Sequence, residues 1–443
     1  MGIVTPTKRP TGRLIARLDR RLSLSWCVAG WVFATLLYIG INQLLGGPAP
    51  GDSSVFVYSA WAIAHGHFAC AYPPASSIDF PLIAPLYPLV AGGLSALFGF
   101  GNSHPFPTQV ALGQNCTNAV KAMTRWSLHA GVISPTLELG YVGWLVLLIG
   151  TVALLRSVGR GATGWEPATL IALACAPPVF MCVQSWLHPQ DLMAMGFILG
   201  AMALVRRGSW AWAGVLLGLA VMSQQFALLG IAPLLILAPT NRRVRFISSV
   251  VLTATVIVTP LAIFTSGRAL KAAIIGSGFT PAERGTYMSE LHLHGTIVLT
   301  FSRILPILAA MALAKWAINR LGEFVFEPVA FFSIIATSLS FRLVFEENLW
   351  GYYLMAVTTL FILTDVVRQR FRWELIGWLA VAFLAYYPLP WGYDPLNFSV
   401  PDWIWQVALC PTAVALAAGP LITEIRGHVR RVAVEVSGQM QSL

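Results

Sequence analysis

Charged and imidazole side chains gather in one hydrophilic stretch, residues 267–294, between two long apolar segments. The charged and imidazole side chains are Arg268, Lys271, Glu283, Arg284, Glu290, His292 and His294, and Tyr287 lies among them. Arg303 lies about two helical turns inside the next apolar segment, where an arginine is costly unless it pairs or faces a polar cavity. A guanidinium is permanently charged and grips two phosphate oxygens at once. We therefore predict that Arg303, together with Arg268, binds a phosphate group.

A further arginine, Arg342, precedes Glu346 and a run of aromatic residues that includes Tyr352 and Tyr353. It is either an additional phosphate ligand or one member of an ion pair at the rim of the protein. Tyr and Trp are common at membrane interfaces, so the aromatic run has an ordinary explanation as well. We take Arg342 as a phosphate-binding candidate and the two tyrosines as candidates for lining the substrate.

Histidines mark two of the polar segments. His292 and His294 share one side of an extended chain but not of a helix. A metal site needs further ligands at suitable spacing, and none is obvious, so we predict no metal site. His188 opens a Pro-containing turn and either faces a ligand or is simply solvated. Asp191, in the same turn, is expected to cap the following helix.

Three other polar segments carry candidates for contact with a substrate. Asp52 has the residue type of a helix N-cap, and Tyr58 follows it at helical spacing, which alone predicts an amphipathic helix lying on the membrane. Tyr72 precedes two prolines, in either a stiff structural loop or a wall beside a lipid or sugar. Gln224 interrupts an apolar stretch, as a cavity-lining residue or as part of an ordinary polar hairpin.

The amino-acid composition indicates the class of protein to which these residues belong. Of 443 residues, 57% are hydrophobic and only 10% are charged, far below the charge content of soluble domains. The net charge of +10 does not indicate nucleic-acid binding, because the basic residues are too sparse to track a phosphate backbone. The chain is therefore predicted to be an all-α polytopic membrane protein.

Apolar segments predict about twelve transmembrane helices in a single domain, 24–422. They are 24–45, 138–156, 167–186, 190–205, 209–222, 225–239, 246–266, 295–318, 325–341, 349–367, 374–390 and 403–422. Most lysines and arginines then fall on one side, which the positive-inside rule makes cytoplasmic. The basic N-terminus 1–23 and the tail 423–443 lie on that side, and we expect a bacterial plasma membrane with the polar turns on its outer face.

A large outer block, 46–137, follows the first helix. Its apolar segment 82–100 is rich in proline and is predicted to be interfacial or re-entrant, because a crossing there would reverse the side of every later arginine group. Cys70 and Cys116 both lie in this block, on the oxidising side of the membrane if the topology holds. We predict a disulfide between them.

The chain resembles the GT-C glycosyltransferases in three features. The first is an Asp just after the first predicted helix, 24–45, which we interpret as an uncleaved signal-anchor. The others are a nearby Tyr-Pro-Pro and a series of transmembrane helices joined by polar outer turns. Within that superfamily the chain most resembles the actinobacterial group that includes polyprenyl-phosphate-mannose-dependent α-mannosyltransferases. The resemblance implies a GT-C-like fold and makes Asp52 the general base. An Arg followed by paired Tyr at a late outer rim, a tendency of the family, is matched by Arg342 and Tyr352-Tyr353. The stretch 101–137 departs from shorter relatives and leaves the acceptor open.

The implied reaction moves mannose or another monosaccharide from a polyprenyl-phosphate donor to a lipid or glycan acceptor, with inversion. Asp52 would accept the proton of the acceptor hydroxyl, and Arg303 or Arg342 would stabilise the departing phosphate. His292, His294 or His188 would orient Asp52 or share its proton. No cofactor is required, although a divalent metal is permitted. A transporter or flippase of a lipid-linked sugar is the alternative; it favours inverted repeats, which the sequence lacks. A non-catalytic scaffold is the third possibility.

Overall fold

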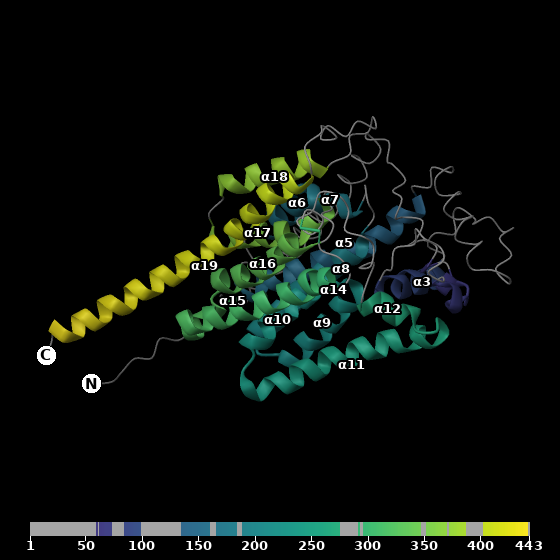
Figure 1. The fold of residues 1–443 in the computed structure, drawn as a ribbon, viewed down its shortest axis with the longest axis horizontal. Coiled ribbons are helices and arrows are strands. Elements are labelled where there is room, and N and C mark those ends of the chain that lie inside the picture. Colours follow the sequence, from purple (N-terminus) through teal and green to yellow (C-terminus); the bar gives the residue numbers. More distant parts are fainter. Residues whose placement is uncertain are drawn as a thin grey trace, which may run out of the picture.

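The computed structural model describes residues 59–60, 62–72, 84–98, 134–159, 165–183, 188–274, 291–292, 296–346, 351–369, 372–386 and 402–441. Within these ranges every regular element is a helix and no strand occurs (Figure 1). Helices are the expected form, because an apolar segment in lipid must satisfy its backbone hydrogen bonds internally. The predicted all-α class is confirmed for this part of the chain.

Five of the described helices are long and apolar enough to cross a bilayer. Their apolar stretches are Gly140–Ser157, Thr240–Phe264, Thr300–Phe326, Pro328–Phe345 and Val407–Val434. Shorter apolar helices accompany them: Leu86–Phe98, Glu166–Cys175, Trp210–Ser223 and Gln225–Leu237. The chain is thus a helical membrane protein. The number of twelve crossings stays a prediction, and the first predicted crossing, 24–45, lies outside the described residues.

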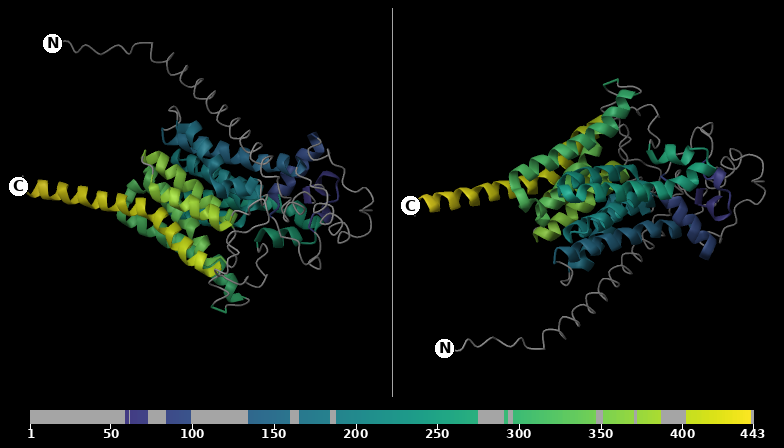
Figure 2. Two further views of the ribbon diagram at one scale, coloured as in Figure 1. Left: turned by 90° about the horizontal axis from the view of Figure 1, so that it is seen from above. Right: turned by 90° about the horizontal axis from the view of Figure 1, so that it is seen from below.

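The helices pack side by side into one bundle (Figures 1 and 2). They are α5 (Ser134–Ser157), α6 (Trp165–Cys175), α7 (Pro177–Val183), α8 (Pro189–Arg206), α9 (Trp210–Ser223), α10 (Leu228–Leu237), α11 (Thr240–Phe264), α15 (Leu305–Leu321), α16 (Pro328–Phe345), α17 (Leu354–Arg368), α18 (Trp373–Tyr386) and α19 (Asp402–Gln441). Helix α8 is the central one: it contacts α5, α7, α9 and α17, and most of its residues are buried. A helix that is apolar on all sides is expected to lie in such a place.

Glycines set the close approach of α5 and α8. A Cβ atom added to Gly150 would lie 2.1 Å from the carbonyl oxygen of Gly196, and one added to Gly196 would lie 2.4 Å from that of Val146. No side chain larger than hydrogen fits between these backbones without moving them. Small residues at helix contacts are the usual way to bring membrane helices together. A Cβ atom added to Gly143 of α5 would likewise lie 2.3 Å from the carbonyl oxygen of Pro189, so the first turn of α8 is also held against α5 by backbone packing.

The two ends of the bundle differ in chemistry. At one end, the Arg206 guanidinium donates to the carbonyl of Phe326, Arg372 pairs with Asp365, and Arg431 lies over the Phe324 ring. Helix α19 runs past its neighbours at this end, while α3 (Leu86–Phe98) and α12 (Arg268–Ile274) lie at the other (Figures 1 and 2). The predicted gathering of basic residues at one end holds for these arginines; which side of the membrane they face stays a prediction.

Several predicted segments have other boundaries or are interrupted. The segment 167–186 contains two helices, α6 and α7, which are separated at Ala176 before two prolines. The segment 295–318 contains α14 (Thr296–Leu299), then a turn of π-helix, η3 (Thr300–Ile304), then α15. Helix α19 continues to Gln441, so most of the predicted tail 423–443 extends the last helix.

The described part of the outer block rests on the same end of the bundle as α12. Its 3-10 turn η1 (Phe68–Cys70) is tied to α12 by Arg268, whose guanidinium donates to the carbonyls of Ala69 and Tyr72. Helix α3 has 13 residues, too few to cross a bilayer, and it packs on α8 and α9. Cys70 is disulfide-bonded. Cys116 lies outside the described residues, so the pairing of these two cysteines stays a prediction.

Candidate functional site

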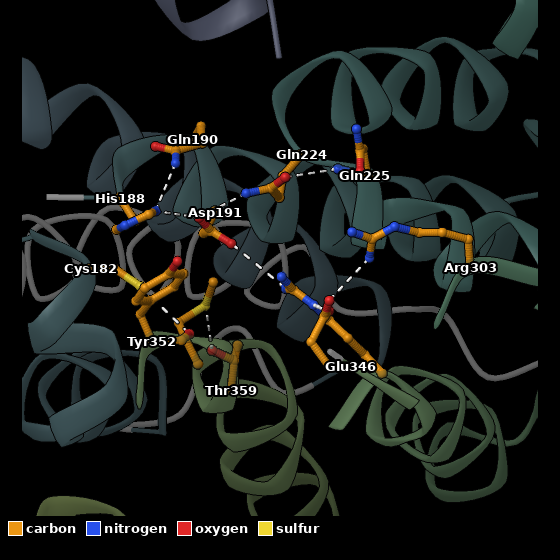
Figure 3. Close-up of polar contacts among 12 residues, drawn as sticks. Cys182, His188, Gln190, Asp191, Gln224, Gln225, Arg303, Glu346, Tyr352 and Thr359 are labelled. Atoms are coloured by element: carbon orange, nitrogen blue, oxygen red, sulfur yellow. Dashed lines mark hydrogen bonds and ion pairs between the residues drawn. The ribbon is translucent and has the colours of Figure 1, made fainter. Parts of the chain in front are cut away.

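Polar side chains from five separate elements meet in one network (Figure 3). The network lies at the end of the bundle opposite Arg206 and Arg431. The side chains come from the start of α8, the turn between α9 and α10, the π-helical turn η3, the end of α16 and the 3-10 turn η5 (Gly351–Tyr353). Because these helices alternate in direction, N-termini of some and C-termini of others reach the same level. The fold thus joins in one network side chains that are as far apart in the sequence as His188 and Tyr353.

Asp191 is the hub of the network and is 1% exposed. Its Oδ2 atom accepts a hydrogen bond from Gln224 Nε2 at 3.2 Å and lies 3.3 Å from Nδ1 of His188. Its Oδ1 atom faces a terminal nitrogen of Arg342 at 3.9 Å. Asp191 occupies the first turn of α8, behind Pro189 at the first helical position, where a negative charge is favoured by the helix dipole.

Glu346 joins the two arginines. Its Oε2 accepts from Arg342 Nε at 2.8 Å, and its Oε1 accepts from a terminal nitrogen of Arg303 at 3.1 Å. Burial by itself would raise the pKa of this carboxyl, but the positive charges of Arg303 and Arg342 outweigh burial and hold its pKa below the ordinary value of 4.5. Glu346 is therefore a buried anion that fixes two guanidinium groups from different helices.

The π-helical turn η3 presents Arg303 to this site. A π-turn adds a residue to the helical repeat and changes the direction of the side chains within it, which is why such turns recur at functional sites. Arg303 is the basic residue of this turn, and its side chain is 27% exposed, against 13% for Arg342. Of the two arginines, Arg303 is thus the more open to an incoming ligand.

Aromatic rings contact Arg342 and His188. The guanidinium carbon of Arg342 lies 3.7 Å from the centre of the Tyr353 ring and 5.1 Å from that of Phe226. The His188 ring stacks on Tyr352, with ring centres 3.7 Å apart. A cation over an aromatic face is stabilised by the ring quadrupole, and stacking holds the imidazole in one plane. The tyrosines thereby restrict the orientations of Arg342 and His188.

Gln190 completes the contacts around His188. Its Nε2 atom lies 2.9 Å from His188 Nδ1, and its buried Oε1 has no hydrogen-bond partner among the described residues. The amide oxygen and nitrogen of Gln are interchangeable by rotation, so either atom can face the ring. An acceptor and a donor are thus both available to this imidazole nitrogen.

The structure brings together six of the residues predicted from the sequence: His188, Gln224, Arg303, Arg342, Tyr352 and Tyr353. Three described candidates lie elsewhere. Arg268 binds the carbonyls of Ala69 and Tyr72, Tyr72 is 2% exposed with its hydroxyl unpaired among the described residues, and His292 is exposed with a φ of 50°. Asp52, Tyr58, His294 and Cys116 lie outside the described residues.

Sequence reasoning missed the two acids as the centre of the site. Asp191 was expected as a helix cap and Glu346 as part of a rim ion pair, and that pair, Arg342 with Glu346, is present. Spacing of three between His188 and Asp191, and of four between Arg342 and Glu346, is the local signal that could have marked them. Nothing in the sequence links Asp191 to Arg342, because their contact depends on packing of α8 near α16.

In the described part of the chain, no group of three or more His, Cys, Asp or Glu side chains could hold a metal ion. The chain matches no model of a known protein family, no curated protein and no solved structure. We therefore infer the function from the residues of the site and from their geometry.

Proposed function

We propose that the protein is a membrane glycosyltransferase that moves a monosaccharide from a polyprenyl-phosphate donor to a lipid or glycan acceptor. The observation that carries this proposal is the convergence of Arg303 and Arg342 on one buried carboxylate at the end of a membrane bundle. Fixed guanidinium groups are suited to a phosphate whose charge grows during the reaction. Apolar helices around them suit a prenyl tail, and the tyrosines suit a sugar.

In the proposed reaction the acceptor oxygen attacks the anomeric carbon while the bond from that carbon to the phosphate oxygen breaks. A single displacement of this kind inverts the anomeric configuration. Asp52 accepts the hydroxyl proton as general base, a role assigned by resemblance to GT-C enzymes. Arg303 and Arg342 stabilise the departing lipid phosphate, which needs no proton to leave. The site would lie on the outer face of a bacterial plasma membrane.

The test is sugar transfer by membranes that contain the protein, supplied with a radiolabelled polyprenyl-phosphate sugar and scored for new glycolipid or glycan. Asp52→Ala is expected to lower turnover by at least about a hundredfold, the usual contribution of a general base, while expression stays normal. Arg303→Ala is expected to raise the donor KM more than the acceptor KM. Near-full turnover by Asp52→Ala would reject the base assignment.

A transporter or flippase of a lipid-linked sugar is the second candidate. It is favoured by helix interruptions near the site: the break between α6 and α7, the turn at Gln224 between α9 and α10, and the π-turn η3. Interrupted helices line the substrate sites of many transporters. Movement of labelled lipid across sealed vesicles without formation of a new glycoside would favour this candidate over the transferase.

A further inference from the structure

Among the residues that the structure describes, the network around Asp191 and Glu346 is balanced in charge before any ligand arrives. Arg303 and Arg342 supply its positive charges, and the two carboxylates, 1% and 2% exposed, supply an equal number of negative ones. With His188 neutral, the charges of these four described side chains sum to zero. A buried group of charges is costly unless it is balanced, so the carboxylates already satisfy both arginines. The site must accept the single negative charge of the donor, and any further negative charge on a ligand needs a new positive charge beside it.

This inference rests on the proposed function, in which the negative charge of the bound lipid increases during turnover. The donor is a phosphodiester with one negative charge. When its bond to the anomeric carbon breaks, the lipid product is a phosphate monoester with up to two negative charges at neutral pH, since its second pKa is near 6. The acceptor hydroxyl releases one proton as its oxygen bonds to the sugar. One new negative charge and one proton thus appear together.

We propose that His188, held by Asp191, takes up the proton released by the acceptor, so that its imidazolium balances the second charge of the lipid phosphate product. His is the side chain in this network whose ordinary titration lies near neutral pH. The proton reaches His188 through Asp52, the general base of the proposed reaction, which becomes ionised again when it passes the proton on. The new charge of the phosphate and the new charge of the imidazolium then balance inside the site.

The contacts of His188 suit an imidazolium. Protonated Nδ1 donates to Asp191 Oδ2, 3.3 Å away. Rotation of the Gln190 amide turns its buried oxygen, which has no hydrogen-bond partner among the described residues, toward the same nitrogen. The stacked face of Tyr352, 3.7 Å away, attracts a cation more strongly than a neutral ring. These groups accept the charged form without a change of backbone.

Among the described residues, the charged and titratable groups that face this region come from several elements. Asp191 belongs to α8, Tyr352 to η5 and Arg342 to α16. Cys182 of α7 contributes a thiol whose Sγ lies 3.9 Å from the carbonyl oxygen of Tyr352. Arg342 faces the Oδ1 atom of Asp191, whereas His188 faces Oδ2, so one carboxylate separates the two cations.

The test compares two ligands on the purified full-length protein by calorimetry at pH 8, in buffers of different ionisation enthalpy. Farnesyl phosphate, a monoester dianion at this pH, is expected to take up about one proton per molecule bound, and its affinity to fall about tenfold per pH unit above pH 7.5. Farnesyl methyl phosphate, a diester with a fixed single charge, is expected to bind with about no uptake and no pH dependence.

Two variants test whether His188 is the residue that takes up the proton. His188→Gln keeps a polar side chain and is expected to lose the proton uptake and the steep pH dependence. Glu346→Gln leaves the network with one excess positive charge, so it is expected to bind the monoester at pH 8 without uptake and more tightly than the natural protein. Thermal unfolding checks that each variant is folded. If His188→Gln does not fold, the inference is tested by comparing proton uptake in the natural protein and in Glu346→Gln.

The outcomes separate this inference from the proposed function, because ligand binding needs no turnover. Binding of the monoester without proton uptake, or full uptake by folded His188→Gln, would overturn the role of His188 even if sugar is transferred. Proton-linked binding in a protein that transfers no sugar would support the role of His188 and reject the transferase. Failure of the natural protein to bind the monoester would overturn both.

Discussion

Glu346 shows how one buried side chain organises this site. It lies four residues after Arg342 on the same helical face and also receives Arg303 from another helix. Its pKa is lowered, so the folded state favours the ionised form. The stabilisation that this provides is fully present above the ordinary pKa of 4.5 and is lost as the pH falls through the lower pKa of the folded protein.

At the residue scale we therefore predict that Glu346→Gln destabilises the protein at pH 7 by about 3 kcal/mol, because two partly buried guanidinium groups lose the buried carboxylate that pairs with both. The gap between natural protein and variant should shrink once the pH falls well below 4.5. Thermal unfolding in detergent across a pH series measures both effects. Glu374→Gln, on an exposed position of α18, is the matched control and should change little at any pH. A constant gap from pH 7 downward would contradict the prediction.

At the element scale, the direct contact of α5 and α8 places the start of α8, and with it His188 and Asp191. The contact has no side chain between Gly150 and Gly196, so the spacing of the two helices is fixed by backbone atoms. The π-turn η3 acts similarly at the other side of the site, where it directs Arg303 toward Glu346. Both features are properties of helices rather than of single functional residues.

Gly150→Ala should accordingly destabilise the bundle by about 1–3 kcal/mol, because its Cβ would overlap the Gly196 carbonyl and push the helices apart. Gly377→Ala, in the middle of α18 with no atom within 4 Å of the added Cβ, provides the control and should be neutral or slightly stabilising. The unfolding midpoints of the two variants, measured in the same detergent, test this difference in stability. Equal losses would show that the close approach of α5 and α8 does not limit stability.

At the scale of the whole molecule, the bundle has one end with arginines held to carbonyls and another end with the Asp191–Glu346 network. Positively charged residues remain preferentially in the cytoplasm during membrane insertion. The disulfide at Cys70, which lies beside α12 at the network end, agrees with an oxidising compartment there. Together these features support a network that faces the outside of the cell.

This orientation predicts opposite labelling of two exposed positions. His292→Cys, which lies just before α14 at the network end, should react with a membrane-impermeant maleimide on intact cells. Trp373→Cys, at the start of α18 beside Arg372, should react only after the membrane is opened. The parent chain measures the background from its own cysteines. The reverse pattern would place the network on the cytoplasmic side and exclude an outer-face enzyme.

Much of this protein could be predicted from local patterns. Apolar runs indicated helices in a membrane, since composition and length alone decide whether a segment is stable in lipid. Polar interruptions at His188, Gln224, Arg303 and Arg342 indicated where the site would lie, because such residues are tolerated only with partners or water. The Arg342–Glu346 pair was accessible too, since residues four apart meet on any helix.

Other features were decided only by tertiary structure. The sequence by itself determined a helical membrane protein with arginines near polar turns, because hydrophobicity and helical spacing act over a few residues. The joining of Asp191 to Arg342 and of Arg303 to Glu346, and the stacking of His188 on Tyr352, arose from packing. The physical reason is that these contacts depend on how closely helices approach and where a helix is interrupted, and both depend on atoms far apart in the chain.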